Sequence, residues 1–305
     1  MLLVIFFLIC FFASIIGAIC GIGGGVIIKP VLDAFGVMDV ATISFLSGCT
    51  VLSMTTYSVI KSKLSGNSNI DQKTGLPLAL GAAVGGLLGK WMFSFVSSLS
   101  PDKNKVGAVQ ATCLMLVTIG TLVYTIYKER IKTYHVTNLM ACVAIGIFLG
   151  ILSSFLGIGG GPINLVVLFF FFSMTTKIAA ENSLYIILFS QLCGLAVVLL
   201  NGSPVGGALP YLPAMAGAGI AGGLIGSTLH RRLSARQVSV LYRCLIFVIL
   251  AVCVWNLRNF PAFFKASLPA DNGAGEKICN SAVSQTEGLT AACGKSLCRL
   301  SIFYF

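Results

Sequence analysis

The glycine-rich sequence GIGGGV occupies residues Gly21–Val26, and it recurs almost unchanged as GIGGGP at Gly157–Pro162. Both copies lie in stretches that are otherwise strongly apolar. Three consecutive glycines disfavour a continuous helix, and unwound backbone at membrane depth is tolerated only where it is buried in protein or lines a cavity. The two copies therefore predict two helix breaks that belong to one functional site.

The composition predicts a membrane protein around these breaks. Of 305 residues, 57% are hydrophobic and 10% are charged, whereas a soluble domain carries about 25% charged residues. Segments near the ~20 residues that a bilayer requires are 2–20, 38–60, 75–98, 106–127, 136–157, 178–200, 208–229 and 238–257. Two shorter stretches, 26–37 and 162–174, follow the glycine motifs. We expect an all-α, multi-pass integral membrane protein with about eight spans, located in the cell membrane.

The repeat extends beyond the glycines. A proline followed by a spaced glycine pattern occurs at Pro77–Gly89 and again at Pro213–Gly226. We therefore expect a first transmembrane repeat over residues 1–133 and a second over 134–257. Residues 258–305 form a polar, cysteine-containing tail whose composition predicts disorder.

Basic residues indicate how the two repeats are oriented. Lys61, Lys63 and Lys73 surround one loop of the first repeat, whereas the equivalent loop at 201–208 carries no charge. Equivalent loops are thus predicted to face opposite sides of the membrane, which makes the repeats inverted. This requires each opening segment and the short stretch after its glycines to form a hairpin that enters and leaves on one side. The net charge of +11 is typical of cytoplasmic loops facing anionic lipid, and we expect no nucleic-acid partner.

The glycine motifs support two interpretations. Unwound backbone would expose N–H groups at the start of each short helix, where the helix dipole attracts an anion. The alternative is close helix packing through small residues. The run of three glycines favours the anion site, and the substrate-binding candidates are Gly23, Gly24, Gly25, Gly159, Gly160 and Gly161.

Ionisable and polar residues near the motifs are further candidates. Lys29 would add a full positive charge close to the first break, unless it pairs with Asp33 four residues later. Glu181 is a candidate for proton coupling. Four polar residues could complete a substrate site or could merely form hydrogen bonds between helices: Thr42, Ser44, Asn182 and Ser183.

Enzymatic chemistry has little support in the sequence. The two histidines, His135 and His230, lie far apart, and no hydrolase or metalloprotease motif is present. The glycine motif lacks the third glycine of a dinucleotide fingerprint, and the cysteines have no metal-ligand spacing. We expect no enzyme activity, no cofactor and no metal.

Together, the doubled Gly-x-Gly-Gly-Gly motif, four apolar segments in each half and Pro30 after the first motif resemble the sulfite exporter TauE/SafE family of anion permeases. The resemblance covers about residues 1–257. It implies transport of sulfite, organosulfonates or related sulfur-containing anions. Two features depart from the family pattern: Pro162 directly after the second motif, with Val166 where Pro30 would fall, and the tail after residue 257.

The sequence thus predicts a transporter that moves a small sulfur-containing oxyanion across the bilayer by alternating access, with a coupling proton as a candidate partner. A passive anion channel is one alternative. A membrane receptor or assembly protein that has kept the fold without transport is another. The identity of the anion and the oligomeric state stay open at this point.

Overall fold

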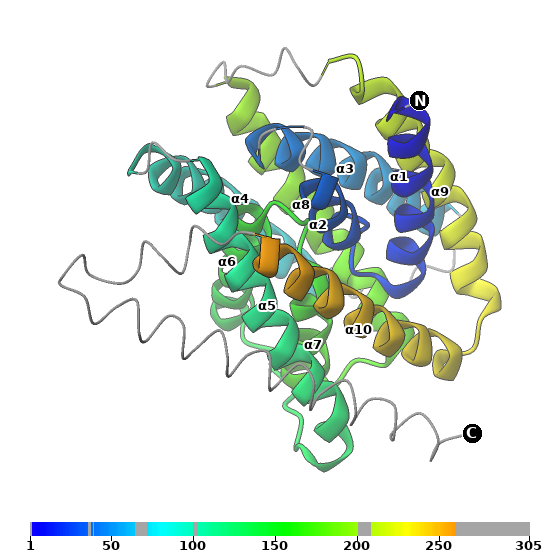
Figure 1. Ribbon diagram of the computed structural model, residues 1–305. Coiled ribbons are helices and arrows are strands. Elements are labelled where there is room, and N and C mark those ends of the chain that lie inside the picture. The colour runs from blue at the N-terminus through cyan, green and yellow to red at the C-terminus, as the bar shows by residue number, and fades with distance from the viewer. Residues whose placement is uncertain are drawn as a thin grey trace, which may run out of the picture. The chain divides into compact units, whose positions relative to one another are not determined.

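The computed structural model describes residues 2–35, 38, 40–64, 72–99, 103–200 and 209–259. In these ranges the chain is helical throughout, with short connections (Figure 1). The helices are α1 (Leu2–Cys20), α2 (Gly25–Phe35), α3 (Val40–Leu64), α4 (Gln72–Leu99), α5 (Lys103–Tyr127), the 3-10 helix η1 (Lys128–Arg130), α6 (Leu139–Leu156), α7 (Gly161–Phe172), α8 (Thr176–Leu200), α9 (Leu212–Arg232) and α10 (Ala235–Asn259).

Eight of the described helices are long and apolar enough to cross a membrane. The two short ones, α2 with 11 residues and α7 with 12, each begin at the last glycine of a motif. The prediction of an all-α, multi-pass membrane protein is confirmed. The second repeat was expected to end at residue 257, and α10 continues two residues further, to Asn259. The tail from residue 260 onward, for which we predicted disorder, lies outside the described residues.

Each glycine motif forms a turn that reverses the chain. In the first glycine turn, Gly21–Gly24, the amides of Gly21 and Ile22 both donate to the Gly17 carbonyl, at 2.9 and 3.2 Å. Gly21 and Gly23 have φ values of 74° and 73°, a conformation that side chains with a Cβ rarely adopt. In the second glycine turn, Gly157–Gly160, three glycines also have positive φ. Backbone conformation therefore requires glycine in both turns, and both predicted helix breaks are present.

The second hairpin begins and ends on the same side. The chain just before α6 lies against the end of α7, where the amide of Tyr134 donates to the Phe170 carbonyl at 2.8 Å and that of Val136 to the Phe171 carbonyl at 2.9 Å. The helix α7 thus returns to the level at which α6 starts. This is the re-entrant path that the sequence predicts for each glycine hairpin.

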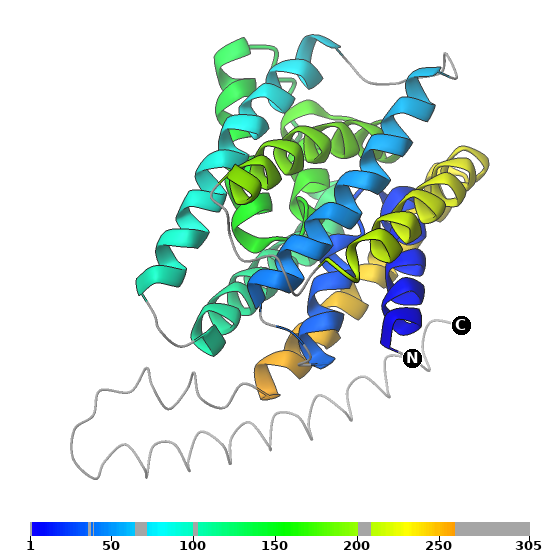
Figure 2. The same cartoon turned by 90° about the horizontal axis from the view of Figure 1, so that it is seen from above.

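The two halves exchange their fourth spanning elements. The helix α4 packs mainly against α6 and α8 of the second half, and α9 packs against α1 and α3 of the first (Figures 1 and 2). Glycines permit these close crossings: a Cβ atom at Gly222 would lie 2.7 Å from the Phe11 carbonyl oxygen, and one at Gly85 would overlap the carbonyl of Ile147. Since Ile147 lies 136 residues after Phe11, the same offset as between Gly23 and Gly159, the two crossings are equivalent.

Side-chain contacts bring three helix ends together at what we name the basic end. At the end of α3, the Ser62 hydroxyl donates to the Glu181 carboxylate near the start of α8, at 3.4 Å. At the end of α9, the Arg231 guanidinium donates to the Lys61 carbonyl, and Lys177 donates to the Arg231 carbonyl, each at 3.3 Å. The equivalent helices α3 and α8 therefore end and begin at the same place. This geometry favours inverted repeats, which stay a prediction.

Candidate functional site

The two glycine turns touch each other at the centre of the described bundle. A Cβ atom at Gly23 would lie 3.2 Å from the Gly159 carbonyl oxygen, and one at Gly25 would lie 2.8 Å from the Ile158 carbonyl carbon. Val51, near the middle of α3, and Ile187, near the middle of α8, pack against the turns. Because these helices span the membrane, the turns meet about halfway across it.

This contact bears on the two interpretations of the motif. Positive φ values and backbone-to-backbone contact together explain why glycine is needed in the turns, without any ligand. Close packing, which the sequence interpretation ranked second, is therefore a sufficient reason for the run of glycines. Anion binding by the backbone amides of the turns stays a prediction that rests on the groups around them.

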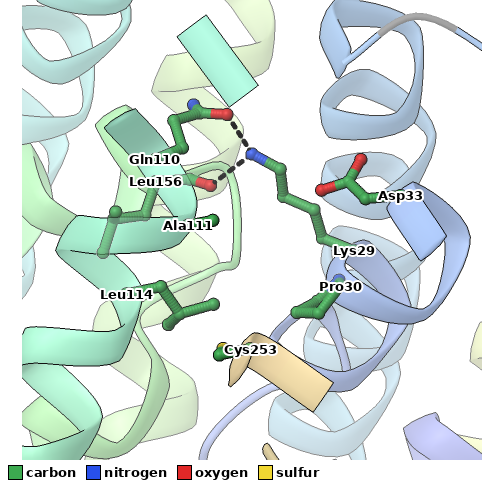
Figure 3. Close-up of a pocket in the computed structure, with 8 residues that line it drawn as sticks. All are labelled: Lys29, Pro30, Asp33, Gln110, Ala111, Leu114, Leu156 and Cys253. Atoms are coloured by element: carbon green, nitrogen blue, oxygen red, sulfur yellow. Dashed lines mark hydrogen bonds between the residues drawn. The ribbon is translucent and has the colours of Figure 1, made fainter. Parts of the chain in front are cut away.

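Lys29 lies at the second glycine turn, although it follows the first in sequence. Its amino group donates to the side-chain carbonyl of Gln110 on α5 and, at 2.9 Å, to the carbonyl of Leu156, the last residue of α6 (Figure 3). Gln110 in turn donates to the Phe155 carbonyl at 2.6 Å. Lys29 is only 3% exposed. The charged end of this side chain is thus fixed at the point where α6 ends and the second turn begins.

Asp33 lines the same small cavity, one helical turn after Lys29 on α2 (Figure 3). Its Oδ1 atom is buried and has no hydrogen-bond partner among the described residues. The alternative in which Lys29 is simply paired with Asp33 is therefore not what the contacts of the amino group indicate. The cavity lies on the side of the turns away from the basic end, because α2 runs toward the start of α3.

Two further polar side chains lie at the second turn. The Ser44 hydroxyl, on α3, lies 2.8 Å from where a Cβ atom at Gly157 would be. The amide nitrogen of Asn164, in the first turn of α7, lies 2.5 Å from the Cβ position of Gly160. Asn164 is 1% exposed. The Ser44 oxygen and both amide atoms of Asn164 are buried without hydrogen-bond partners among the described residues, an arrangement that is costly unless a ligand or water satisfies them.

The first turn has apolar residues at all three equivalent positions. With the offset of 136 residues, Leu165 corresponds to Lys29, Ala180 to Ser44, and Ile28 to Asn164. Ala180 packs on Gly21, as Ser44 packs on Gly157. The polar groups have therefore accumulated at the second turn alone.

A second cavity lies between the first turn and the basic end. Ala18 at the end of α1, Ser58 and Ser62 on α3, Glu181 on α8 and His230 on α9 contribute to its lining. Glu181, predicted as a proton-coupling residue, is half-buried here and lies apart from Lys29, whose cavity is on the other side of the turns. The two cavities have volumes of about 10 and 30 Å³, roughly the space of one water molecule each.

The remaining candidates are less clearly part of either cavity. Thr42 is half-buried in the first turn of α3. The Asn182 amide donates to the Ile178 carbonyl of its own helix at 2.9 Å, which is the bland role that the sequence left open. Ser183 is fully buried on α8, and its hydroxyl has no partner among the described residues.

The sequence interpretation missed three residues that the structure brings to these places: Gln110, Asn164 and His230. Gln110 and Asn164 had a usable signal, since each is a lone amide side chain in an apolar helix, where an unsatisfied polar group is expensive. His230 was considered only as a catalytic residue. Its neighbours come from α1, α3 and α8, and sequence spacing does not reveal them.

Comparison with known proteins agrees with this architecture. A probable membrane transporter protein of Bacillus subtilis (strain 168), YunE, is 24% identical over 267 residues, which cover 78% of this chain and 92% of that protein. No solved structure matches the chain. The family model of the sulfite exporter TauE/SafE matches residues 6–255, nearly the whole helical region. With its paired glycine hairpins and eight spans, the chain belongs to the sulfite exporter TauE/SafE family of membrane transporters.

Proposed function

We propose that the protein transports a small sulfur-containing oxyanion, such as sulfite or an organosulfonate, and that the anion binds at the second glycine turn. The observation that carries this proposal is the asymmetry between the turns. Lys29, Ser44 and Asn164 surround the second turn, whereas Leu165, Ala180 and Ile28 occupy the equivalent places at the first. A cation, a hydroxyl and an amide are the donors that an oxyanion needs.

The start of α7 adds a further favourable group. Gly160 precedes the first residue of this helix, so the N–H groups of its first turn point toward the second glycine turn, together with the positive end of the helix dipole. Pro162 removes one of these N–H donors. The unpartnered Asn164 amide, two residues later, is placed to supply a replacement donor.

Alternating access is the mechanism that we infer from the positions of the cavities. The Lys29 cavity lies on one side of the touching turns and the Glu181 cavity on the other, and each has the volume of about one water molecule. An oxyanion of several heavy atoms needs more room than that. Passage thus requires the turns to move, which favours a transporter with inverted repeats over a passive channel.

The positive-inside rule orients the molecule. Lys61, Lys63, Lys177 and Arg231 gather at the basic end, which we assign to the cytoplasm. The Lys29 cavity then faces the outer half of the membrane. The second glycine turn, where we place the anion, lies between this cavity and the basic end.

Uptake into proteoliposomes tests the proposal. Purified protein would be reconstituted and offered radiolabelled sulfate and sulfite, thiosulfate and a short organosulfonate, with empty liposomes as the control. Saturable exchange of at least one sulfur oxyanion is expected. Failure of every anion to exchange, in protein that remains folded after reconstitution, would favour the receptor or assembly role. Flux that no gradient of a second ion can drive uphill would favour the channel.

A further inference from the structure

The cavity at the basic end contains a histidine with an unusual environment. His230 is 6% exposed, in the last turn of α9, and its Nδ1 atom lies 2.7 Å from the Ile19 carbonyl oxygen near the end of α1. Its Nε2 atom is buried and has no hydrogen-bond partner among the described residues. The ring thus connects α1 to a cavity that Glu181 and Ser58 also line.

The hydrogen bond to Ile19 fixes how the ring binds protons. A backbone carbonyl can only accept, so Nδ1 must carry hydrogen. In the neutral imidazole, Nε2 then has a free lone pair. A proton that reaches the cavity adds to this lone pair, forms an N–H bond and leaves the Nδ1 hydrogen bond in place. No other bond breaks, and the added proton can depart by the same route.

We propose that His230 is the proton-binding site that couples a proton gradient to anion transport, with Glu181 as the carboxylate that faces it. The assignment rests on the proposed transport function. Glu181 alone was the proton-coupling candidate from the sequence. The structure gives it a partner whose ring bonds the helix that ends at the first glycine turn.

The charges around His230 come from three sides. Glu181 and Lys177 lie on α8, and Arg231 is its neighbour on α9. On α3, the Lys61 amino group is turned toward Thr228, with a distance of 2.5 Å to that hydroxyl, and α1 carries no charged side chain. Lys177 and Arg231 use donors on the carbonyls of Arg231 and Lys61. Glu181 is thus the one negative group among these named neighbours, and it favours the protonated ring.

The link to the anion site runs through the first turn. Ile19 lies two residues before Gly21, whose positive φ starts the reversal of the chain. The first turn touches the second, where we place the anion. A charge gained or lost at His230 therefore acts on the end of α1, and movement of α1 must displace the contact between the turns. A histidine that only filled a core position would have both ring nitrogens satisfied.

The first test does not depend on transport. The chain has two histidines, so protein labelled with ¹⁵N-histidine gives two sets of ring signals, and a His135→Gln variant assigns them. His135 is exposed, outside the cavities that contain Glu181 and Lys29. We expect the His230 signals to show Nδ1–H in the neutral ring and to change with pH, and added sulfite to move the midpoint of that change, because coupled sites influence each other reciprocally. A His230 ring that never titrates between about pH 4 and 9 would overturn the proposal.

The second test measures coupling directly. His230→Asn keeps an amide nitrogen close to the Nδ1 position, and so a donor for Ile19, but removes the titratable nitrogen. In proteoliposomes with a pH gradient of one unit, the wild type and His135→Gln should accumulate the anion about tenfold if one proton moves per anion. His230→Asn should exchange anions at a rate within about threefold of wild type, yet accumulate none.

Each result is decisive. Tenfold accumulation by His230→Asn refutes the assignment, and so does the loss of exchange in folded His230→Asn, because a residue that serves only coupling is dispensable for exchange. Wild-type exchange that ignores the pH gradient also refutes it. If the wild type exchanges no anion while His230 titrates normally, the proposed transport function has failed instead.

Discussion

Replacement of Lys29 by glutamine is the sharpest test of the anion site. In the structure, the Lys29 amino group donates to Gln110 and to the Leu156 carbonyl, at the start of the second glycine turn. A Cβ atom at Gly157 would lie 3.6 Å from the same nitrogen. The group therefore stabilises the end of α6 and stands beside the proposed anion position at the same time.

The magnitude follows from the type of bond. A hydrogen bond with a charged partner contributes about 1.5–3 kcal/mol, and every ~1.4 kcal/mol corresponds to a tenfold change in affinity. We expect Lys29→Gln to raise the apparent KM for the transported anion roughly tenfold to hundredfold. Lys29→Arg keeps the charge and should retain more affinity than Lys29→Gln. The measurement is the initial rate of anion exchange in proteoliposomes at matched amounts of protein.

Lys61→Gln is the matched control for lost hydrogen bonds. Lys61 also donates to a helix carbonyl, that of Leu224 at 3.2 Å, and to a side-chain oxygen, but it lies at the basic end. Both variants should lower the thermal midpoint of the protein in detergent, and only Lys29→Gln should raise KM. A wild-type KM in Lys29→Gln, with a lowered midpoint, would mean that Lys29 merely caps α6 and that our anion site lacks its cation.

Three further predictions concern orientation, packing and the amide. On a background without native cysteines, Ser98→Cys at the end of α4 should react with an impermeant thiol reagent in intact cells and Ser234→Cys, its counterpart 136 residues later, should not; equal labelling would refute inverted repeats. Gly25→Ala should reduce the yield of folded protein, because its Cβ would meet the Ile158 backbone at 2.8 Å, whereas Gly120→Ala meets nothing within 4 Å and should be neutral or stabilising. Asn164→Leu should raise KM about twofold to tenfold while thermal stability holds or increases, since it removes a buried amide without partners; an unchanged KM would remove Asn164 from the site.

The fold could be predicted to a large extent because its signals are local. Apolar length identifies membrane spans, and consecutive glycines interrupt helices, so the eight spans and both breaks were expected. The repeat followed from the recurrence of the motif. The exchange of α4 and α9 between the halves was not expected, because it depends on which helix faces meet, and small residues occur on several faces of these helices.

The candidate site was less predictable, because its contacts join distant parts of the chain. Lys29 lies next to the first motif in sequence, which suggested the first break, but its partner Gln110 is 81 residues away and its Leu156 partner 127 residues away. His230 bonds to a carbonyl 211 residues earlier. Pairwise spacing such as i,i+4 reveals contacts within one helix, and so it offered Asp33 as the partner of Lys29. Contacts between helices need the packing first.

An inverted repeat supplies two equivalent turns, and the difference between them supports a division of labour. At the second turn, the three facing positions are Lys29, Ser44 and Asn164, and at the first they are Leu165, Ala180 and Ile28. An anion is therefore held at one turn only. The first turn is free of such groups, yet α1, which leads into it, accepts the hydrogen bond of His230. Since Gly23 packs on the Gly159 carbonyl, neither turn can shift without the other. Anion binding at one turn and protonation beside the other would then act on a single shared contact, which is the physical requirement for coupled transport.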